Sequence, residues 1–201
     1  MSRSSLLKAW FGSPVEFRRV WFSNTEEFLQ QLSPFKTVID KMMACPNDQV
    51  SYKDCWVGDD EPSLDEPHEM LADILALDQL PRTFYKKTPT MYSCDEKASN
   101  VAQTFITKGF LDKLTYEEER LFVLLTVQHS ENKEIQAKSV ELHQTYLPKL
   151  YPMISNYATS HAEVVGKFSR FPHRNAILNR ESTQEEVEHL TSGKLFDWEK
   201  I

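Results

Sequence analysis

The sequence predicts an all-α fold of antiparallel helices joined by short connections. Apolar residues recur at helical spacing, and no segment shows the strict alternation of a half-buried strand. Only 5 glycines occur in 201 residues, fewer than a sheet with many tight turns usually needs. With 40% apolar and 26% charged residues, the chain has the composition of one globular domain, which we expect to span residues 1–201.

The first part of the chain predicts short helices followed by a long loop. Ser33-Pro34 interrupts an otherwise helical stretch, and a polar, acidic segment rich in turn-forming residues comes after it. We expect a flexible end over residues 1–5, helices over 4–11, 25–32 and 35–43, and an irregular acidic loop over 44–66.

A longer helix is expected to begin at Pro67 and to end at Pro81, which disfavours helical backbone before it. Three leucine and isoleucine side chains share one face of this helix with Asp78, at i, i+3, i+4 and i+7 spacing. The next helix is expected over 93–108, with Gly109 as its C-terminal stop.

Two capping boxes predict where later helices begin. Thr115 and Glu118 open a helix to about Gln128, and its middle, LFVLLTV, is apolar on all sides. We therefore expect this to be the central buried helix. Further helices are expected over 132–146 and 155–168, and a last one from the Ser182–Glu185 box to about Gly193.

Charge and cysteine content exclude several classes of protein. A net charge of -7 argues against a nucleic-acid or anionic-membrane surface, and no apolar run approaches the roughly 20 residues that span a bilayer. Cys45, Cys55 and Cys94 form no CxxC motif, which favours a reducing, cytoplasmic setting. The basic, serine-containing first 20 residues leave a mitochondrial transit peptide as the alternative.

The segment LALDQLPR, residues 75–82, places an acid on an apolar stripe. Burying the Asp78 carboxylate there is costly unless another group pairs with it. Arg82 lies one helical turn later and can reach back to it. The segment predicts either an intrahelical Asp–Arg pair or a ligand contact.

Two histidine segments follow. QHSE, residues 128–131, comes directly after the most apolar helix, so His129 and Glu131 leave the edge of the core. Such a pair suits general acid–base work or a metal, or it caps the helix and pairs with an arginine. His161 shares a face with Val165 and Phe168, as either a satisfied core histidine or a ligand contact.

The string SRFPHRNAILNRES, residues 169–182, threads three arginines through apolar residues. Pro172 ends a helix, so the next three residues lie on a rigid bend. One interpretation is a buried lattice in which Arg170 and Arg174 pair with Asp78, Glu131 or Glu181. The other is an anion pocket floored by phenylalanines, because guanidinium groups suit carboxylate and phosphate.

Taken in order, LDQLPR, HSE, HAEVVGKF, RFPHRN and NRESTQEE resemble the domain-of-unknown-function family 924 over roughly residues 6–196. The WFG string at residues 10–12 also resembles the family pattern. The resemblance implies an all-helical, TPR-like fold and a shared polar centre, and it implies no activity. The chain departs from the pattern at Thr83 and Asn132, and at Ser169 and Asn179, where the family has glycine.

We expect the polar segments to converge on a pocket for an anionic small molecule or a peptide carboxylate. The expected acid–base groups are His129, Glu131 and His173. The expected binding groups are Asp78, Arg82, His161, Arg170, Arg174, Asn175 and Arg180. The motifs favour neither catalysis nor simple binding.

Two alternatives stand beside this pocket: a groove that binds a protein partner, and a buried polar lattice without any ligand. A metal site built from the histidines and Glu131 is disfavoured, because no HExxH motif occurs and nearby arginines repel cations. No dinucleotide fingerprint, phosphate-cradling glycine loop or nucleophile motif occurs either, so we expect no cofactor.

Overall fold

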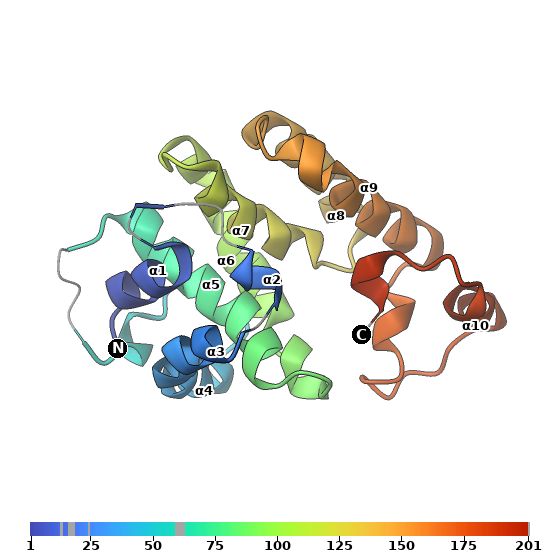
Figure 1. Ribbon diagram of the computed structural model, residues 1–201, viewed down its shortest axis with the longest axis horizontal. Coiled ribbons are helices and arrows are strands. Elements are labelled where there is room, and N and C mark those ends of the chain that lie inside the picture. Colours follow the sequence, from blue (N-terminus) through green and yellow to red (C-terminus); the bar gives the residue numbers. More distant parts are fainter. Residues whose placement is uncertain (13, 16–18, 24, 59–62, 201) are drawn as a thin grey trace.

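The computed structural model describes residues 1–12, 14–15, 19–23, 25–58 and 63–200, and it is all helical in that part of the chain, as predicted (Figure 1). The α-helices are α1 (Arg3–Phe11), α2 (Val20–Ser23), α3 (Glu26–Leu32), α4 (Lys36–Ala44), α5 (Glu66–Phe84), α6 (Asp95–Thr107), α7 (Glu117–Gln128), α8 (Lys133–Tyr146), α9 (Tyr151–Phe168) and α10 (Gln184–Thr191). Short 3-10 turns that matter below are η2 (Lys53–Cys55), η3 (Pro89–Tyr92), η5 (Pro172–Arg174) and η6 (Asp197–Glu199).

Two helices share the centre of the fold. The long helix α5 packs against α1, α4, α6 and α7, and α7 packs against α5, α6, α8 and α9. The LFVLLTV run lies in α7 and is buried except at Leu125, so the expected burial is found. Helices α8 and α9 lie side by side next to α7, and the segment after α9 lies beyond them (Figure 1).

Aromatic rings fix the N-terminal helices to the centre. Trp10, Phe11 and Trp21 surround Phe122 of α7, with ring centroids 5.2, 5.7 and 4.9 Å from it. The Trp21 Nε1 also donates a hydrogen bond of 2.7 Å to the carbonyl of Trp10. Edge-to-face contacts at these distances add to the free energy of burial. The WFG string is therefore part of the core.

Two prolines lie inside helices rather than outside them. Helix α5 continues through Pro81 to Phe84, although we expected Pro81 to end it. Leu80 and Pro81 are both buried, so the packing of this end of α5 offsets the hydrogen bond that Pro81 cannot donate. Helix α9 begins four residues earlier than expected because Pro152 stands in its first turn, where no N–H is required.

Both predicted capping boxes lie one residue too early. At α7, Glu119 rather than its neighbour accepts from the backbone N–H of Tyr116 at 3.2 Å. At α10, Thr183 and Glu186 cap each other, with N···O distances of 2.7 and 3.2 Å. Arg170 holds the Glu186 carboxylate in place, and this non-local contact decides the register.

The N-terminal end and the loop after α4 are both fixed by Asp73. Within residues 1–5, where we expected a flexible end, Arg3 is buried and donates two hydrogen bonds of 3.0 Å to Asp73. The Trp56 Nε1 donates to the same carboxylate at 2.8 Å. The expected acidic loop is irregular apart from η2, and residues 59–62 lie outside the described residues.

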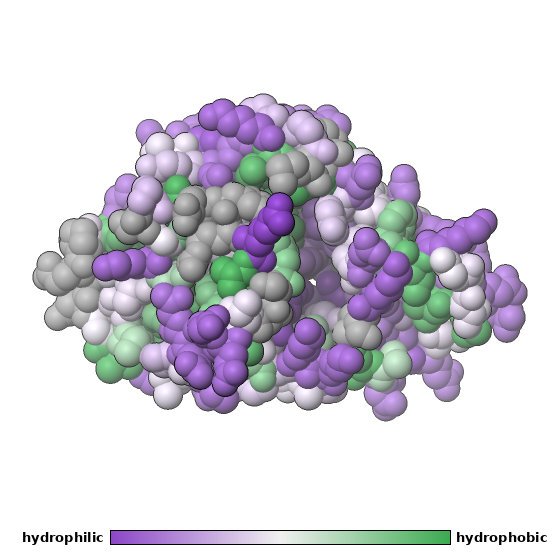
Figure 2. Space-filling model, viewed as in Figure 1, coloured by the Kyte–Doolittle hydropathy of each residue, from purple (hydrophilic) through white to green (hydrophobic). Residues whose placement is uncertain are grey.

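The described helices include none that is both long enough and apolar enough to cross a membrane. Figure 2 shows one face of the molecule, which is mainly hydrophilic. A hollow opens on this face between the region of α2 and the C-terminal segment (Figures 1 and 2).

Candidate functional site

A cleft of about 350 Å³ lies where the end of α5, η3, the turn after α7, the α9 helix, η5 and η6 meet. We name it the basic cleft, because arginines, lysines and histidines dominate its walls. The lining residues used below are Arg82, Lys86, Tyr92, His129, His161, His173, Arg174, Asp197, Trp198 and Lys200.

Two arginines of the cleft wall alternate with two carboxylates in a chain of ion pairs, in the order Asp78, Arg82, Asp95 and Arg174. The Arg82 guanidinium lies 3.1 Å from the Asp78 carboxylate and 2.9 Å from that of Asp95. Asp95 also pairs with Arg174 at 3.0 Å. The intrahelical pair expected between Asp78 and Arg82 is therefore present, as part of a larger chain of ion pairs. Asp78 is almost fully buried, so the arginines face the cleft and this acid lies behind them.

His129 is oriented by Asp78. The His129 Nδ1 lies 2.8 Å from an Asp78 carboxylate oxygen. Burial opposes ionisation of Asp78, but Arg82 and His129 hold the pKa of this carboxyl below its usual range. Burial also lowers the pKa of His129, against the pull of Asp78. The imidazole is thus neutral, with Nδ1–H donating to Asp78 and Nε2 left as an acceptor, an arrangement that can accept a proton.

Arg174 is held between two aromatic rings. Its guanidinium carbon lies 4.4 Å from the centroid of Phe171 and 4.6 Å from that of Tyr92. Its terminal nitrogens donate to Asp95 at 3.0 Å and to the carbonyl of His129 at 3.2 Å. Its Nε is buried and has no hydrogen-bond partner. A buried donor left unpaired is uncommon, and it marks this place in the cleft wall as unusual.

Glu131 pairs with an arginine, which is one of the two alternatives that the QHSE segment left open. It forms a two-pronged ion pair with Arg180, at 2.7 and 3.0 Å, and accepts from the backbone N–H of Phe171 at 2.8 Å. Arg180 also donates to the Asn175 side chain at 3.0 Å. Burial opposes ionisation of Glu131, but the hydrogen bond from Arg180 lowers its pKa, so it is a poor base.

Arg170 also lies outside the basic cleft, although we expected it to bind ligand. It forms a two-pronged ion pair with Glu186, at 2.6 and 2.7 Å, and Asn175 donates to the same carboxylate at 3.3 Å. The lattice interpretation expected Arg170 and Arg174 to pair with Asp78, Glu131 or Glu181. Both arginines are ion-paired, but with Glu186 and Asp95 instead. Of the three expected acids, Glu131 does pair with an arginine, and that arginine is Arg180.

Two more histidines complete the basic cleft. The His161 ring stacks on Trp198, with centroids 3.7 Å apart, and its Nδ1 bonds the carbonyl of Tyr157 at 2.7 Å. The His173 ring lies edge-on to Trp198 at 5.3 Å, and its Nδ1 is buried without a partner. Burial holds the pKa of His161 well below its ordinary value. Burial, with help from Arg174, lowers the pKa of His173 to about 3.

A second cleft, of about 510 Å³, lies against the other side of His129 and Arg174. Its charged walls differ from those of the basic cleft, because Asp95, Glu96 and Glu131 line it beside a single arginine. An anion would meet mainly carboxylates there. His129 lines both clefts and can be approached from either.

Four residues that shape the site were not singled out in the sequence: Tyr92, Asp95, Glu186 and Trp198. Asp95 stands in the first turn of α6, where an acid is ordinary because it complements the helix dipole. Trp198 lies near the C-terminal end, outside every helical pattern. The aromatic content of that segment is the one signal that the sequence offers.

Among the described residues, no group of three or more His, Cys, Asp or Glu side chains is arranged to hold a metal ion. This holds also for the three histidines of the basic cleft. Figure 1 shows why these residues meet only in the folded chain, since α5, α7, α9 and the C-terminal segment are far apart in sequence.

Comparisons with known proteins place the chain in a family without an assigned activity. A family model described as "Bacterial protein of unknown function (DUF924)" matches residues 6–194. A solved structure of a protein of unknown function from Agrobacterium tumefaciens is 26% identical in sequence, with a TM-score of 0.67. The match covers 95% of this chain and 97% of that one. A search of curated proteins finds no match.

Proposed function

This chain belongs to the DUF924 family, and we propose that its basic cleft binds a small anionic molecule that carries a phosphate or carboxylate group. One observation carries the proposal. Four cations (Arg82, Lys86, Arg174 and Lys200) line the cleft against the single acid Asp197, although the whole chain has a net charge of -7. Such a local reversal of charge attracts anions into the cleft.

Ion pairs reduce the excess of positive charge in the basic cleft but do not remove it. Lys200 pairs with Asp197 at 2.7 Å, and the two arginines pair with acids behind the wall. Lys86 is exposed at the rim and has no ion-pair partner in the described part of the chain. An anion bound between Lys86 and the two arginines would form an ion pair with Lys86, which shares its charge with no other group in the described part of the chain. It would also contact the sides of the two guanidinium groups that face the cleft.

The neutral state of His173 supports a positive potential in the cleft. Burial is the main cause of its lowered pKa, and Arg174 and Arg180 add to it by repelling the proton. A bound anion would oppose that repulsion and raise the pKa of His173. Anion binding in this cleft should therefore be accompanied by proton uptake at His173 as the pH falls toward its pKa of about 3.

The size of the cleft favours a small molecule over a folded partner. Ligand pockets usually measure about 300–1,000 Å³, and the basic cleft lies near the lower end of that range. A peptide carboxylate remains the competing occupant. Binding of small anions and binding of a peptide with a free C-terminus distinguish these two occupants.

Catalysis is a second candidate function, favoured by the Asp78–His129 pair. Asp78 fixes the tautomer of His129, and the free Nε2 can take a proton from a bound molecule or from water. The basic cleft would then hold the anionic group of a substrate while His129 acts as the general base.

The test is titration calorimetry of the parent chain with inorganic phosphate, citrate, a nucleoside monophosphate and a short peptide with a free C-terminus. We expect one of the first three to bind, and Lys86→Glu to weaken it by about tenfold, since the change reverses one charge at the rim. Lys138→Ala changes an exposed lysine that does not line the cleft and should leave binding unchanged. If none of the four probes binds, the proposal is wrong. Binding of the peptide alone supports the peptide carboxylate instead.

A further inference from the structure

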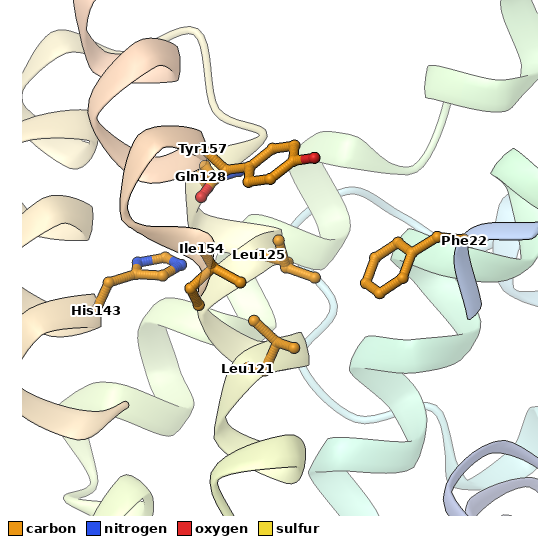
Figure 3. A pocket seen from close by; sticks show the side chains of 7 residues that line it. All are labelled: Phe22, Leu121, Leu125, Gln128, His143, Ile154 and Tyr157. Carbon is orange, nitrogen blue, oxygen red and sulfur yellow. The ribbon is translucent and has the colours of Figure 1, made fainter. Parts of the chain in front are cut away.

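A separate pocket of about 280 Å³ lies between α2, α7, α8 and α9. Figure 3 shows the Phe22 ring on one side, facing Leu121, Leu125 and Ile154, with the Tyr157 ring above them. Side chains of this kind exclude ions and favour apolar molecules. Cavities of about 150 Å³ already accept a benzene ring, so this pocket is large enough for a small aromatic or branched molecule.

Two buried polar atoms in the pocket lining have no hydrogen-bond partner. They are the His143 Nε2 and the Gln128 Oε1, on side chains that are 1% and 2% exposed. Buried polar atoms are nearly always hydrogen-bonded in native proteins. Two unmet atoms on the wall of one apolar pocket therefore indicate a ligand that satisfies them.

The chemistry of both atoms is fixed by their neighbours. The His143 Nδ1 lies 2.8 Å from the carbonyl of Ser139, so this nitrogen carries the proton and Nε2 is a bare acceptor. Burial lowers the pKa of His143 to about 4, so the ring stays neutral at ordinary pH.

Gln128 is oriented by His161 in the same way. The His161 Nδ1 donates to the carbonyl of Tyr157, which leaves the His161 Nε2 as an acceptor. The Gln128 Nε2 lies 3.2 and 3.4 Å from the two ring nitrogens, so its N–H group faces the ring. The Gln128 Oε1 is then the atom without a partner, and it also is an acceptor.

We propose that this pocket binds a small, uncharged, mainly apolar molecule that carries a hydroxyl or N–H donor, of the phenol or alcohol class. The apolar walls hold its body, and its O–H or N–H donates to the His143 Nε2 or to the Gln128 Oε1. A molecule with two donors can satisfy both acceptors. The site is distinct from the basic cleft and does not depend on the function proposed for that cleft. Gln128 and His161 meet between the two sites, since each lines one of them.

The experiment compares phenol with toluene, which has nearly the same shape but no donor. Titration calorimetry with the full chain measures both affinities. Without an acceptor in the pocket, toluene should bind more tightly because phenol loses its hydrogen bonds to water. We expect the parent chain to prefer phenol by about tenfold or more, since a site built to hydrogen-bond a hydroxyl rejects the analogue that lacks it.

Two variants test whether the preference for phenol over toluene depends on the acceptors of His143 and Gln128. His143→Leu and Gln128→Met each remove one acceptor at similar volume, and we expect the preference for phenol to fall or to reverse in favour of toluene. Lys86→Glu, which alters the rim of the basic cleft, should keep the parent preference, and saturating phosphate should not displace phenol. If His143→Leu does not fold, Gln128→Met and the parent chain still decide.

Three outcomes would overturn the proposal. The parent chain shows no phenol binding up to low millimolar concentration, or it binds toluene at least as tightly as phenol, as expected if water already satisfies both acceptors. In the third, the preference for phenol survives when both residues are substituted, which would mean that the acceptor of the phenol hydroxyl lies elsewhere in the protein. If the parent chain binds phenol but none of the anions, only the function proposed for the basic cleft is refuted.

Discussion

The indole of Trp198 stacks on the imidazole of His161, with ring centroids 3.7 Å apart and planes 22° apart. His161 belongs to the body of α9, whereas Trp198 belongs to η6 near the C-terminal end. The same indole meets Phe171 edge-on at 5.6 Å and donates to the Ser160 hydroxyl at 2.9 Å. Trp198 therefore anchors the C-terminal segment to α9, and with Asp197 and Lys200 it forms one wall of the basic cleft.

Removing this indole should loosen the C-terminal segment. We expect Trp198→Ala to lower the free energy of unfolding by about 2–3 kcal/mol, because it deletes a stacked ring and a hydrogen bond. Trp198→Phe keeps an aromatic ring and loses only the N–H donor, so it should cost about 1 kcal/mol. Urea denaturation measures both, and equal losses in the two variants would show that stacking contributes little.

Arg174 should be one of the most sensitive positions in the chain. Arg174→Ala leaves Asp95 with one arginine instead of two and empties the space between Phe171 and Tyr92. We expect a loss of about 3 kcal/mol in the free energy of unfolding, because breaking a buried ion pair leaves a poorly compensated charge.

The matched control is another cation that pairs at the surface. Lys167 lies 3.2 Å from Glu185, with both side chains more than half exposed, so Lys167→Ala should change stability by less than about 0.5 kcal/mol. Denaturant melts of both variants test the contrast. A loss below about 1 kcal/mol for Arg174→Ala would contradict a structural role for the chain of ion pairs.

Much of the helical order could be predicted because helix signals are local. The helix expected over 132–146 is found at Lys133–Tyr146, and that expected over 93–108 is found at Asp95–Thr107. The four-residue helix α2 was missed, since so short a segment shows no periodicity. Its position depends on Trp21, which packs onto a helix about 100 residues away in sequence.

In the site, too, contacts between residues close in sequence could be predicted, and contacts between distant residues could not. The Asp78–Arg82 pair could be predicted because the two residues lie one turn apart on one helix. Asp95 and Arg174 are 79 residues apart, and nothing in the sequence around either one names the other. Residue types placed the unusual chemistry in the right segments. Which arginine meets which acid is decided by helix packing, so Glu186 and Asp95 could not be found.

Among the described residues, three positions other than glycine adopt left-handed backbone: Lys87, with φ of 62°, and two in the C-terminal part of the chain. Ser169 ends α9 with φ of 61°, and Asn179 has φ of 53°. These are the two places where the chain departs from glycine in the family pattern, and both have the positive φ that glycine adopts most readily. We expect Ser169→Gly to stabilise the chain by about 0.5–1 kcal/mol and Asn179→Gly by less, because asparagine tolerates this region better than serine.

A nearby glycine offers the opposite substitution. Gly166 lies inside α9, and a methyl group there would meet no atom within 4 Å. Gly166→Ala should therefore also stabilise, by about 0.5–1 kcal/mol, through helix propensity. Thermal unfolding of the variants tests both signs. Destabilisation by Ser169→Gly would mean that the serine makes a contact that outweighs its backbone strain.

Stability should fall as the pH is lowered, through the buried histidines. Burial lowers the pKa of His129, His143, His161 and His173, to about 4 for His143 and about 3 for His173. Below their ordinary value of 6.5 the unfolded chain takes up protons that the folded chain refuses, so unfolding is favoured as pH falls. Each histidine contributes up to about 1.4 kcal/mol per pH unit.

The window in which this effect dominates lies between the ordinary pKa values of histidine and glutamate, 6.5 and 4.5. His68 opposes it, because its hydrogen bond to Glu119 raises its pKa to about 9, but it is one group against four. The lowered pKa values of Glu131 and Glu186 matter only below it, because unfolded glutamate is still ionised above it. Urea melts near pH 7, 6 and 5 should give a falling free energy of unfolding. His143→Leu should make the slope shallower by about 1 kcal/mol per pH unit, since one titrating group is gone. Identical slopes in the parent and the variant would mean that His143 is protonated as readily in the folded chain as in the unfolded one.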